Sequence, residues 1–249
     1  MADVMVGSIN DNGTGGRTYV IYGKSNNTTA VNVSDVLAGN GGFVINGIAA
    51  GQASLGASVS AAGDVNGDGY ADLIVGGATA DTTTGTDAGS AYVVFGKATN
   101  VNVELSAIGS NGFLINGATA SDWAGYSVSN AGDVNGDGLG DLIVGAKNNT
   151  GGIGRSYVVF GKATQTTVEL SALGTNGFAI NGQNASDNSG YIVSSAGDVN
   201  GDGFADLAVF APLADPAAGT DAGRSYVVFG KSSTTAVDLS AIAAGTAAG

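Results

Sequence analysis

Three copies of the segment GDVNGDG give this chain a repeated group of closely spaced carboxylates, and their types and spacing suggest metal chemistry. The copies occupy residues 63–69, 132–138 and 197–203, and an aspartate follows each copy three residues later. Nine of the 21 acidic residues therefore lie in three short stretches. Because like charges at short range repel one another, we expect a bound cation to offset their proximity.

The spacing of the oxygen atoms in each copy defines the expected cation. Side-chain oxygens stand at loop positions 1, 3, 5 and 9, a backbone carbonyl stands at position 7, and a glycine at position 6 permits a sharp turn. Hard oxygen ligands in a flexible loop favour Ca²⁺ over Mg²⁺, which needs a stricter octahedron. The three predicted calcium sites are Asp64, Asn66, Asp68, Tyr70 and Asp72; Asp133, Asn135, Asp137, Leu139 and Asp141; and Asp198, Asn200, Asp202, Phe204 and Asp206, with Tyr70, Leu139 and Phe204 contributing carbonyl oxygens.

Two other interpretations of the loop fit less well. EF-hand and dockerin loops need an acidic residue at position 12 and a following helix, whereas position 12 here is Val75, Val144 or Val209 inside a strand-like run. A plain hairpin turn of the Asx type explains the letters NGDG. It does not explain why three aspartates crowd into the same turn three times.

The loops belong to a longer unit that recurs along the chain. YVIYGK at 19–24 returns as YVVFGK at 92–97, 157–162 and 226–231, and GFVING at 42–47 returns twice. Short runs rich in Val, Ile, Phe and Tyr, bounded by Gly, Asn, Asp and Thr, predict about four strands in each unit and no helix with a long apolar stripe. Repeated four-stranded units predict an all-β fold, a β-propeller or a propeller segment built from antiparallel blades.

The repeat predicts one domain with incomplete blades at both ends. ADVMVG near the N-terminus aligns with ADLIVG from Ala71, so Asp3 takes position 9 of a loop whose earlier positions are absent. The C-terminal segment stops before another GFxING strand. We therefore expect a piece of a longer array, or a subunit completed by other copies. The predicted single repeat domain, 1–249, contains a partial blade 1–47, blades 53–117 and 122–182, and a partial blade 187–249.

Composition narrows the classes of function. The net charge is −13 and no Lys/Arg cluster is present, which argues against nucleic-acid binding. The chain has neither Cys nor His, so thiolate sites and His-dependent catalytic triads are excluded. Glu104 and Glu169 are equivalent positions of the repeat rather than a catalytic pair. No apolar run reaches the roughly 20 residues that cross a bilayer. We expect neither an enzyme nor an inserted membrane protein.

The repeated residues resemble a known family. The stretch GASVSAAGDVNGDGYADLIVGG is similar to the FG-GAP repeat of integrin α-subunit propellers and of bacterial surface or secreted proteins, and about three and a half such repeats cover the chain. The resemblance implies a Ca²⁺ loop between the two innermost strands of each blade. Two departures are present: Leu55, Ala124 or Ser189 replaces the Phe of FG, and Phe210 replaces the Gly of GAP.

The resemblance implies a calcium-stabilised extracellular or cell-surface module for adhesion or structural assembly. Its expected partners are another protein, or its own copies joined through the terminal blades. The alternative is a carbohydrate-binding propeller, or a non-catalytic accessory part of a secreted hydrolase, with a glycan as partner. Trp123 is the single tryptophan, and we interpret it as a packing residue between blades rather than as a ligand contact.

Overall fold

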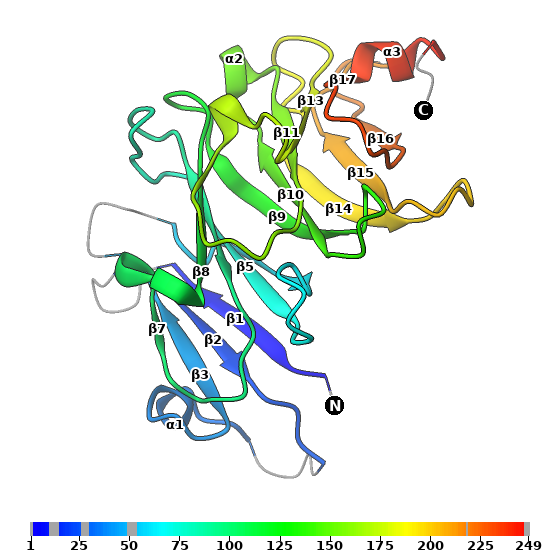
Figure 1. The fold of residues 1–249 in the computed structure, drawn as a ribbon. Coiled ribbons are helices and arrows are strands. Elements are labelled where there is room, and N and C mark those ends of the chain that lie inside the picture. The colour runs from blue at the N-terminus through cyan, green and yellow to red at the C-terminus, as the bar shows by residue number, and fades with distance from the viewer. Residues whose placement is uncertain (1, 10–14, 26–29, 49–53, 218, 247–249) are drawn as a thin grey trace.

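The strands of the protein gather into twisted sheets that follow one another from the N-terminus to the C-terminus (Figure 1). The computed structural model describes residues 2–9, 15–25, 30–48, 54–217 and 219–246. In spatial order, the first sheet of this described part contains β1 (Val4–Ser8), β2 (Arg17–Ile21), β3 (Gly42–Asn46) and β7 (Val103–Glu104), and the second contains β4 (Ser58–Gly63), β5 (Asp72–Gly77), β6 (Ser90–Val94), β8 (Gly112–Asn116) and β12 (Val168–Glu169). The third sheet contains β9 (Ala124–Gly132), β10 (Asp141–Ala146), β11 (Arg155–Val159), β13 (Gly177–Asn181) and β17 (Val237–Asp238). The fourth contains β14 (Ile192–Gly197), β15 (Asp206–Ala211) and β16 (Arg224–Val228).

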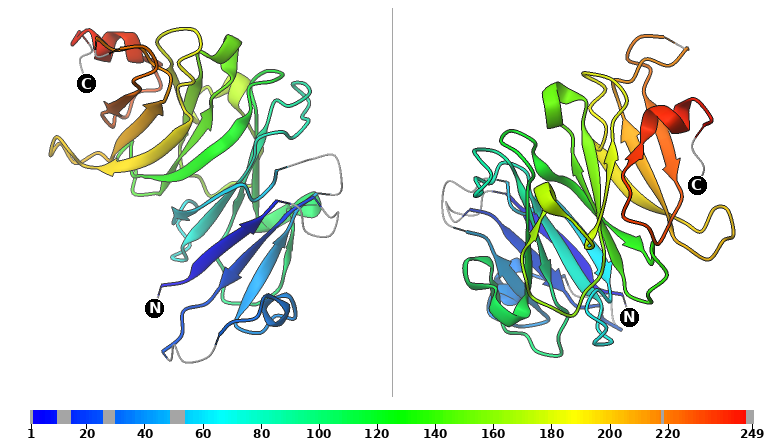
Figure 2. Two further views of the ribbon diagram at one scale, coloured as in Figure 1. Left: turned by 180° about the vertical axis from the view of Figure 1, so that it is seen from behind. Right: turned by 45° about the horizontal axis from the view of Figure 1, so that its top comes forward.

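The prediction of an all-β propeller segment is confirmed. Within each sheet the consecutive strands pair antiparallel, and the inner strands β4, β9 and β14 lie side by side, as the turned views also show (Figure 2). Helices are short and lie in the connections. They are α1 (Val33–Leu37), α2 (Asn149–Gly152), α3 (Leu239–Ala243) and the 3₁₀ turns η1 (Leu105–Ala107), η2 (Gly109–Asn111) and η3 (Leu170–Ala172).

Each of the first three sheets also contains a short parallel strand that belongs to the following repeat. β7 pairs with β3, β12 with β8, and β17 with β13. The repeat pattern does not indicate any pairing partner for these VE or VD segments, whereas the structure places each one at the outer edge of the preceding sheet. An asparagine at the end of β3, β8 or β13 holds the added strand by donating its Nδ2–H to a carboxylate of that strand. The three pairs are Asn46 to Glu104 at 2.6 Å, Asn116 to Glu169 at 2.8 Å and Asn181 to Asp238 at 2.7 Å.

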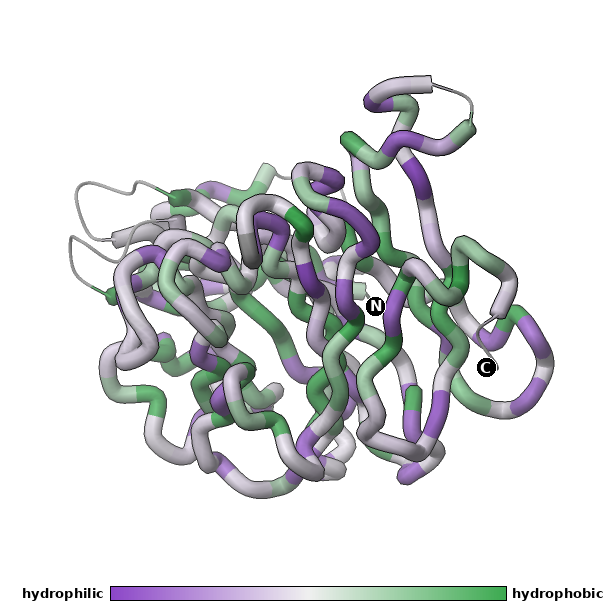
Figure 3. The backbone as a smooth tube through the Cα atoms, turned by 90° about the horizontal axis from the view of Figure 1, so that it is seen from above, coloured by the Kyte–Doolittle hydropathy of each residue, from purple (hydrophilic) through white to green (hydrophobic). Residues whose placement is uncertain are grey.

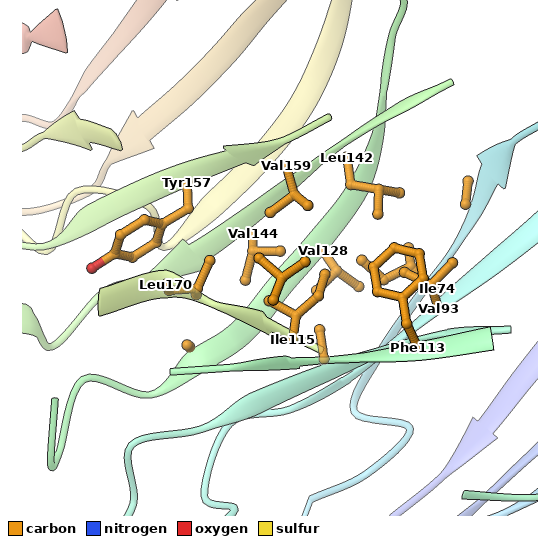
Figure 4. Close-up of a cluster of buried hydrophobic side chains, with 14 of the residues drawn as sticks. Ile74, Val93, Phe113, Ile115, Val128, Leu142, Val144, Tyr157, Val159 and Leu170 are labelled. Atoms are coloured by element: carbon orange, nitrogen blue, oxygen red, sulfur yellow. The ribbon is translucent and has the colours of Figure 1, made fainter. Parts of the chain in front are cut away.

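The hydrophobic core lies between neighbouring sheets. Figure 4 shows Phe113 and Ile115 of β8 in one cluster with Val144 of β10, and all three side chains have no exposed surface. Because a middle sheet is covered on both faces, its second strand DLIVGA is buried at every position. This pattern is typical of strands covered on both sides and not of half-exposed ones. The core thus joins adjacent blades as well as filling each one.

Glycines allow the blades to approach closely at one repeated position. A Cβ on Gly76 would lie 2.1 Å from the carbonyl oxygen of Gly125 in the next blade, and a Cβ on Gly145 would lie 2.2 Å from that of Gly190. Phe210 takes the equivalent place in β15, and no further inner strand covers it in the described part of the chain. The departure from the GAP pattern therefore falls at a position that no other described inner strand approaches.

The recurring YVVFGK segment also connects consecutive repeats. The ammonium of Lys97 lies 5.0 Å from the ring centroid of Phe43 in the preceding sheet. Lys162 over Phe113 and Lys231 over Phe178 repeat the contact at 4.5 Å. Burial lowers the pKa of all three lysines. These cation–π contacts give a physical reason for the repetition of the Lys and the Phe.

Hydrophobic and hydrophilic residues are interspersed along the described backbone (Figure 3). In the part of the chain that the structure describes, no helix is long and apolar enough to cross a membrane.

Candidate metal centres

Each predicted loop joins the inner strand of a sheet to the second strand. The glycine that precedes the loop pairs with the position-9 aspartate, as Gly63 does with Asp72, next to a break in the ladder register. The same closure recurs in the other two loops. Neighbouring loops are joined as well, because the Asp64 carbonyl accepts the Gly140 N–H at 2.8 Å and the Asp133 carbonyl accepts the Ala205 N–H at 2.8 Å. The three loops therefore form a continuous row at one end of the inner strands.

The aspartate at position 1 organises the turn. In the first loop, Asp64 Oδ1 accepts the N–H groups of Gly67 at 2.8 Å and Asp68 at 3.0 Å, while its Oδ2 accepts that of Gly69 at 2.9 Å. Positive φ angles at Gly67 and Gly69 allow these N–H groups to point inward. The other loops repeat the bonds around Asp133 and Asp198 within 0.1 Å.

Positions 3 and 5 form an oxygen-rich tip. Asn66 Oδ1 accepts the Asp68 N–H at 2.8 Å, and its Nδ2–H donates to Asp68 Oδ2 at 2.9 Å. The N–H of Tyr70, at position 7, donates to Asp68 Oδ1 at 2.8 Å. Asp68 is exposed to solvent. The equivalent contacts join Asn135, Asp137 and Leu139, and Asn200, Asp202 and Phe204.

The aspartate at position 9 is buried and clamps the loop to the third strand. Asp72 Oδ2 accepts the Val65 N–H at 2.8 Å and Oδ1 accepts the Gly96 N–H at 2.7 Å. Asp141 and Asp206 make the same pair of bonds. The loop spacing alone does not predict this second role, although the recurring Gly after Phe in YVVFGK is its signal. Asp3 fits the pattern too, because its Oδ1 accepts the Gly23 N–H at 2.8 Å.

Burial determines the electrostatics of these clamps. It raises the pKa of Asp72 to about 6 and that of Asp141 to about 7, while the two backbone hydrogen bonds to each carboxylate oppose the rise. The nearby charges of Asp64 and Asp68 raise the pKa of Asp72 further. Asp133 and Asp137 act in the same way on Asp141. In the first two loops, the aspartates at positions 1 and 5 are thus close enough to the one at position 9 to repel it.

The donor set fits a hard cation, although the acidic side chains do not converge as a ready-made cage. In the described residues, no three Asp, Glu, His or Cys side chains form a group that could hold a metal ion. Their oxygens face the N–H groups of the loop and of the third strand instead. Each carboxylate oxygen has two lone pairs, so the observed hydrogen bonds leave acceptor capacity at positions 1 and 5. Oxygen-only donors and mutual repulsion agree with a Ca²⁺ ligand set.

Adjacent loops also contact each other through side chains at position 7. A Cβ on Gly67 would lie 3.2 Å from Leu139 Cδ2, and a Cβ on Gly136 would lie 2.7 Å from Phe204 Cε1. Leu139 and Phe204, at position 7 of the second and third loops, thus cover the turn of the preceding loop. Their side chains have a packing role beside the predicted ligand role of their carbonyls.

The serial sheets and the hairpin loops between inner strands define a repeat protein of the β-propeller class. Comparison with family models identifies FG-GAP repeats at residues 55–94, 124–159 and 189–228. Three segments of the chain thus match the FG-GAP repeat, and each spans three strands and one loop. Integrin alpha-6 of Gallus gallus is 28% identical over 152 residues, which cover 59% of this chain and 12% of that integrin.

Proposed function

We propose that this protein is a calcium-stabilised, non-catalytic module that serves extracellular binding or surface assembly. The FG-GAP repeats and the similarity to an integrin alpha subunit support the extracellular binding or structural role. The observation that carries the calcium proposal is the threefold repetition of one hydrogen-bonded loop that contains three aspartates. In the first two loops the carboxylates at positions 1 and 5 repel the one at position 9. A divalent cation would remove that repulsion and add ligand bonds.

The chemistry assigns different tasks to the loop positions. The carboxylates at positions 1 and 5 and the amide oxygen at position 3 would hold Ca²⁺ at the exposed tip. The buried carboxylate at position 9 would turn one oxygen toward the ion, and in the first two loops, where burial raises the pKa of Asp72 and Asp141, it would first lose its proton. Calcium binding would then link the loop to the third strand, because Gly96 and Gly161 donate to these same carboxylates.

Calcium titration tests this proposal directly. Isothermal titration of metal-free protein is expected to give three Ca²⁺ per chain, one for each complete loop. Glu104→Gln serves as a matched control, because Glu104 is acidic but lies on β7, where it accepts a hydrogen bond from Asn46. The control should also bind three ions. Absence of heat and of saturable binding in the unmodified protein would overturn the calcium proposal.

We also propose that the module associates through its terminal blades, with a protein partner or with its own copies. β16 pairs with β15 along one edge. In the described residues, no strand pairs with its other edge. Val227 and Phe229 are 43% and 40% exposed there, beside a groove of about 550 Å³ that Val237 and Ile242 also line. In the complete blades β8 and β13 occupy this position. An added strand would pair with such an edge.

A further inference from the structure

Three aromatic side chains from two neighbouring blades form a cluster around a lysine. The rings of Trp123 and Tyr126 stack with centroids 6.4 Å apart, and Tyr191 of the next blade lies 5.1 Å from Tyr126. The Lys147 ammonium lies 4.9 Å from the Trp123 ring, 4.1 Å from Tyr126 and 4.8 Å from Tyr191. Cation–π attraction to three rings fixes the position of this charge.

The three rings border a cavity of about 510 Å³ at the end of the inner strands opposite the metal loops, and Lys147 contacts this cavity through the rings. Trp123, Tyr126 and Tyr191 line the cavity together with Ser58 and Ser127, and no carboxylate is among its lining residues. Ser58 Oγ accepts the Val128 N–H at 2.9 Å, and Ser127 Oγ accepts the Val193 N–H at 3.1 Å. The hydroxyl protons of both serines are therefore left to donate.

The internal repeat shows that blade packing does not require these aromatic residues. In the first matched repeat, the positions equivalent to Trp123, Tyr126 and Lys147 are held by Ser54, Ala57 and Ala78. The backbone at this position is nevertheless left-handed in both repeats, since φ is +79° at Ser54 and +59° at Trp123. Trp123 is only half-buried, and its main ring partner is Tyr126 of its own blade. The interpretation of Trp123 as a packing residue between blades does not account for the cluster.

The charge of Lys147 is not matched by an acidic side chain. Among the residues that the structure describes, Lys147 makes cation–π contacts and no ion pair. The nearby Asp122 is buried, and it accepts hydrogen bonds from the N–H and the hydroxyl of Thr119. In a chain with a net charge of −13, an unpaired lysine beside an aromatic cavity is available to an anionic group of a ligand.

We propose that this cavity binds a saccharide that carries a carboxylate. The aromatic rings would stack against the C–H face of a pyranose ring, the serine hydroxyls would donate to its hydroxyl oxygens, and Lys147 would pair with its carboxylate. This inference rests on the proposed binding role of the module and not on calcium, because the metal loops lie at the other end of the strands.

Trp123 provides a direct probe, because it is the single tryptophan of the chain. Methyl β-glucuronide and methyl β-glucoside have the same ring and differ in having a carboxylate or a hydroxymethyl group. Titration of the calcium-loaded protein with the glucuronide is expected to change the tryptophan fluorescence saturably, with a Kd on the order of 1 mM. The glucoside is expected to bind about tenfold more weakly, because it cannot pair with Lys147.

Variants that copy the first repeat locate the binding. Lys147→Ala introduces the residue found at position 78, and it should weaken glucuronide binding about tenfold while leaving glucoside binding unchanged. Trp123→Ser copies position 54, and by calorimetry it should abolish binding of both sugars. Lys97→Ala removes a lysine that lies over a ring elsewhere, and it should bind like the unmodified protein.

Three results would overturn the proposal: no saturable response up to about 10 mM glucuronide, equal affinity for both sugars, or unchanged binding in Lys147→Ala and Trp123→Ser. Circular dichroism of each variant separates loss of the site from loss of the fold. The calcium titration of the same protein is read independently, so failure of the metal proposal and failure of the sugar proposal remain distinguishable.

Discussion

Metal-free protein is expected to become less stable as the pH rises from 5 to 8. The raised pKa values of Asp72, about 6, and Asp141, about 7, mean that the folded protein favours the neutral acids. A group whose folded pKa lies above its unfolded value contributes stability below the unfolded pKa and loses it as the pH rises through the folded pKa. The loss therefore begins near the unfolded pKa of about 4 and continues to about one pH unit above the folded values, near pH 8, where both carboxyl groups have lost their protons.

The structure sets the size of this effect. Neither side chain has exposed surface, so solvent screening does not remove the cost of the charge. With about 1.4 kcal/mol for each pH unit between the folded and unfolded pKa, the two groups together cost on the order of 4 kcal/mol between pH 5 and pH 8. For a chain of 249 residues, the melting temperature should fall by on the order of 10 °C.

Thermal unfolding followed by circular dichroism, in buffers stripped of metal, measures this trend. In saturating Ca²⁺ the sign should reverse, because bound calcium requires the deprotonated carboxylates and its stabilisation grows with pH. The double variant Asp72→Asn with Asp141→Asn should flatten the metal-free profile. A melting temperature that rises from pH 5 to 8 without metal, or an unchanged profile in the double variant, would refute the reasoning.

Two further predictions concern packing and association. Phe178→Ala should lower the free energy of unfolding by about 3–5 kcal/mol in urea denaturation. The reason is that the ring is buried, has its centroid 6.1 Å from that of Phe160 and lies under Lys231. A loss below about 1 kcal/mol would contradict this role in packing. Light scattering at micromolar concentration should show dimers or larger assemblies, and Val227→Lys with Phe229→Lys should yield monomers because charge on the open edge opposes strand pairing; a stable unmodified monomer would contradict the proposed association.

Local patterns were sufficient to predict the repeat, the all-β class and the composition of the loops. GDVNGDG predicts a turn because glycine readily adopts positive φ, as Gly67 and Gly69 do in the structure. The strands form in the runs rich in Val, Ile, Phe and Tyr that predict them. These features depend on residues close together in sequence. They could therefore be inferred without knowing which segments meet in space.

The missed features depend on contacts between distant segments. The double hydrogen bond of Asp72 joins it to Gly96, 24 residues away, and the parallel pairing of β7 with β3 joins segments 58 residues apart. The aromatic cluster brings Trp123 and Lys147 to Tyr191 of another blade. Neither periodicity nor composition indicates which of these residues meet, because the blade geometry determines it.

The most direct test of the central claim is the calcium stoichiometry of single-loop variants. Asp68→Ala, Asp137→Ala and Asp202→Ala each remove an exposed position-5 carboxylate from one loop and leave the buried clamp in place. Isothermal titration is expected to give three Ca²⁺ for the unmodified chain and two for each variant, with unchanged β-sheet circular dichroism in calcium. Three ions in every variant, or none in the unmodified chain, would contradict the assignment of one calcium ion to each loop.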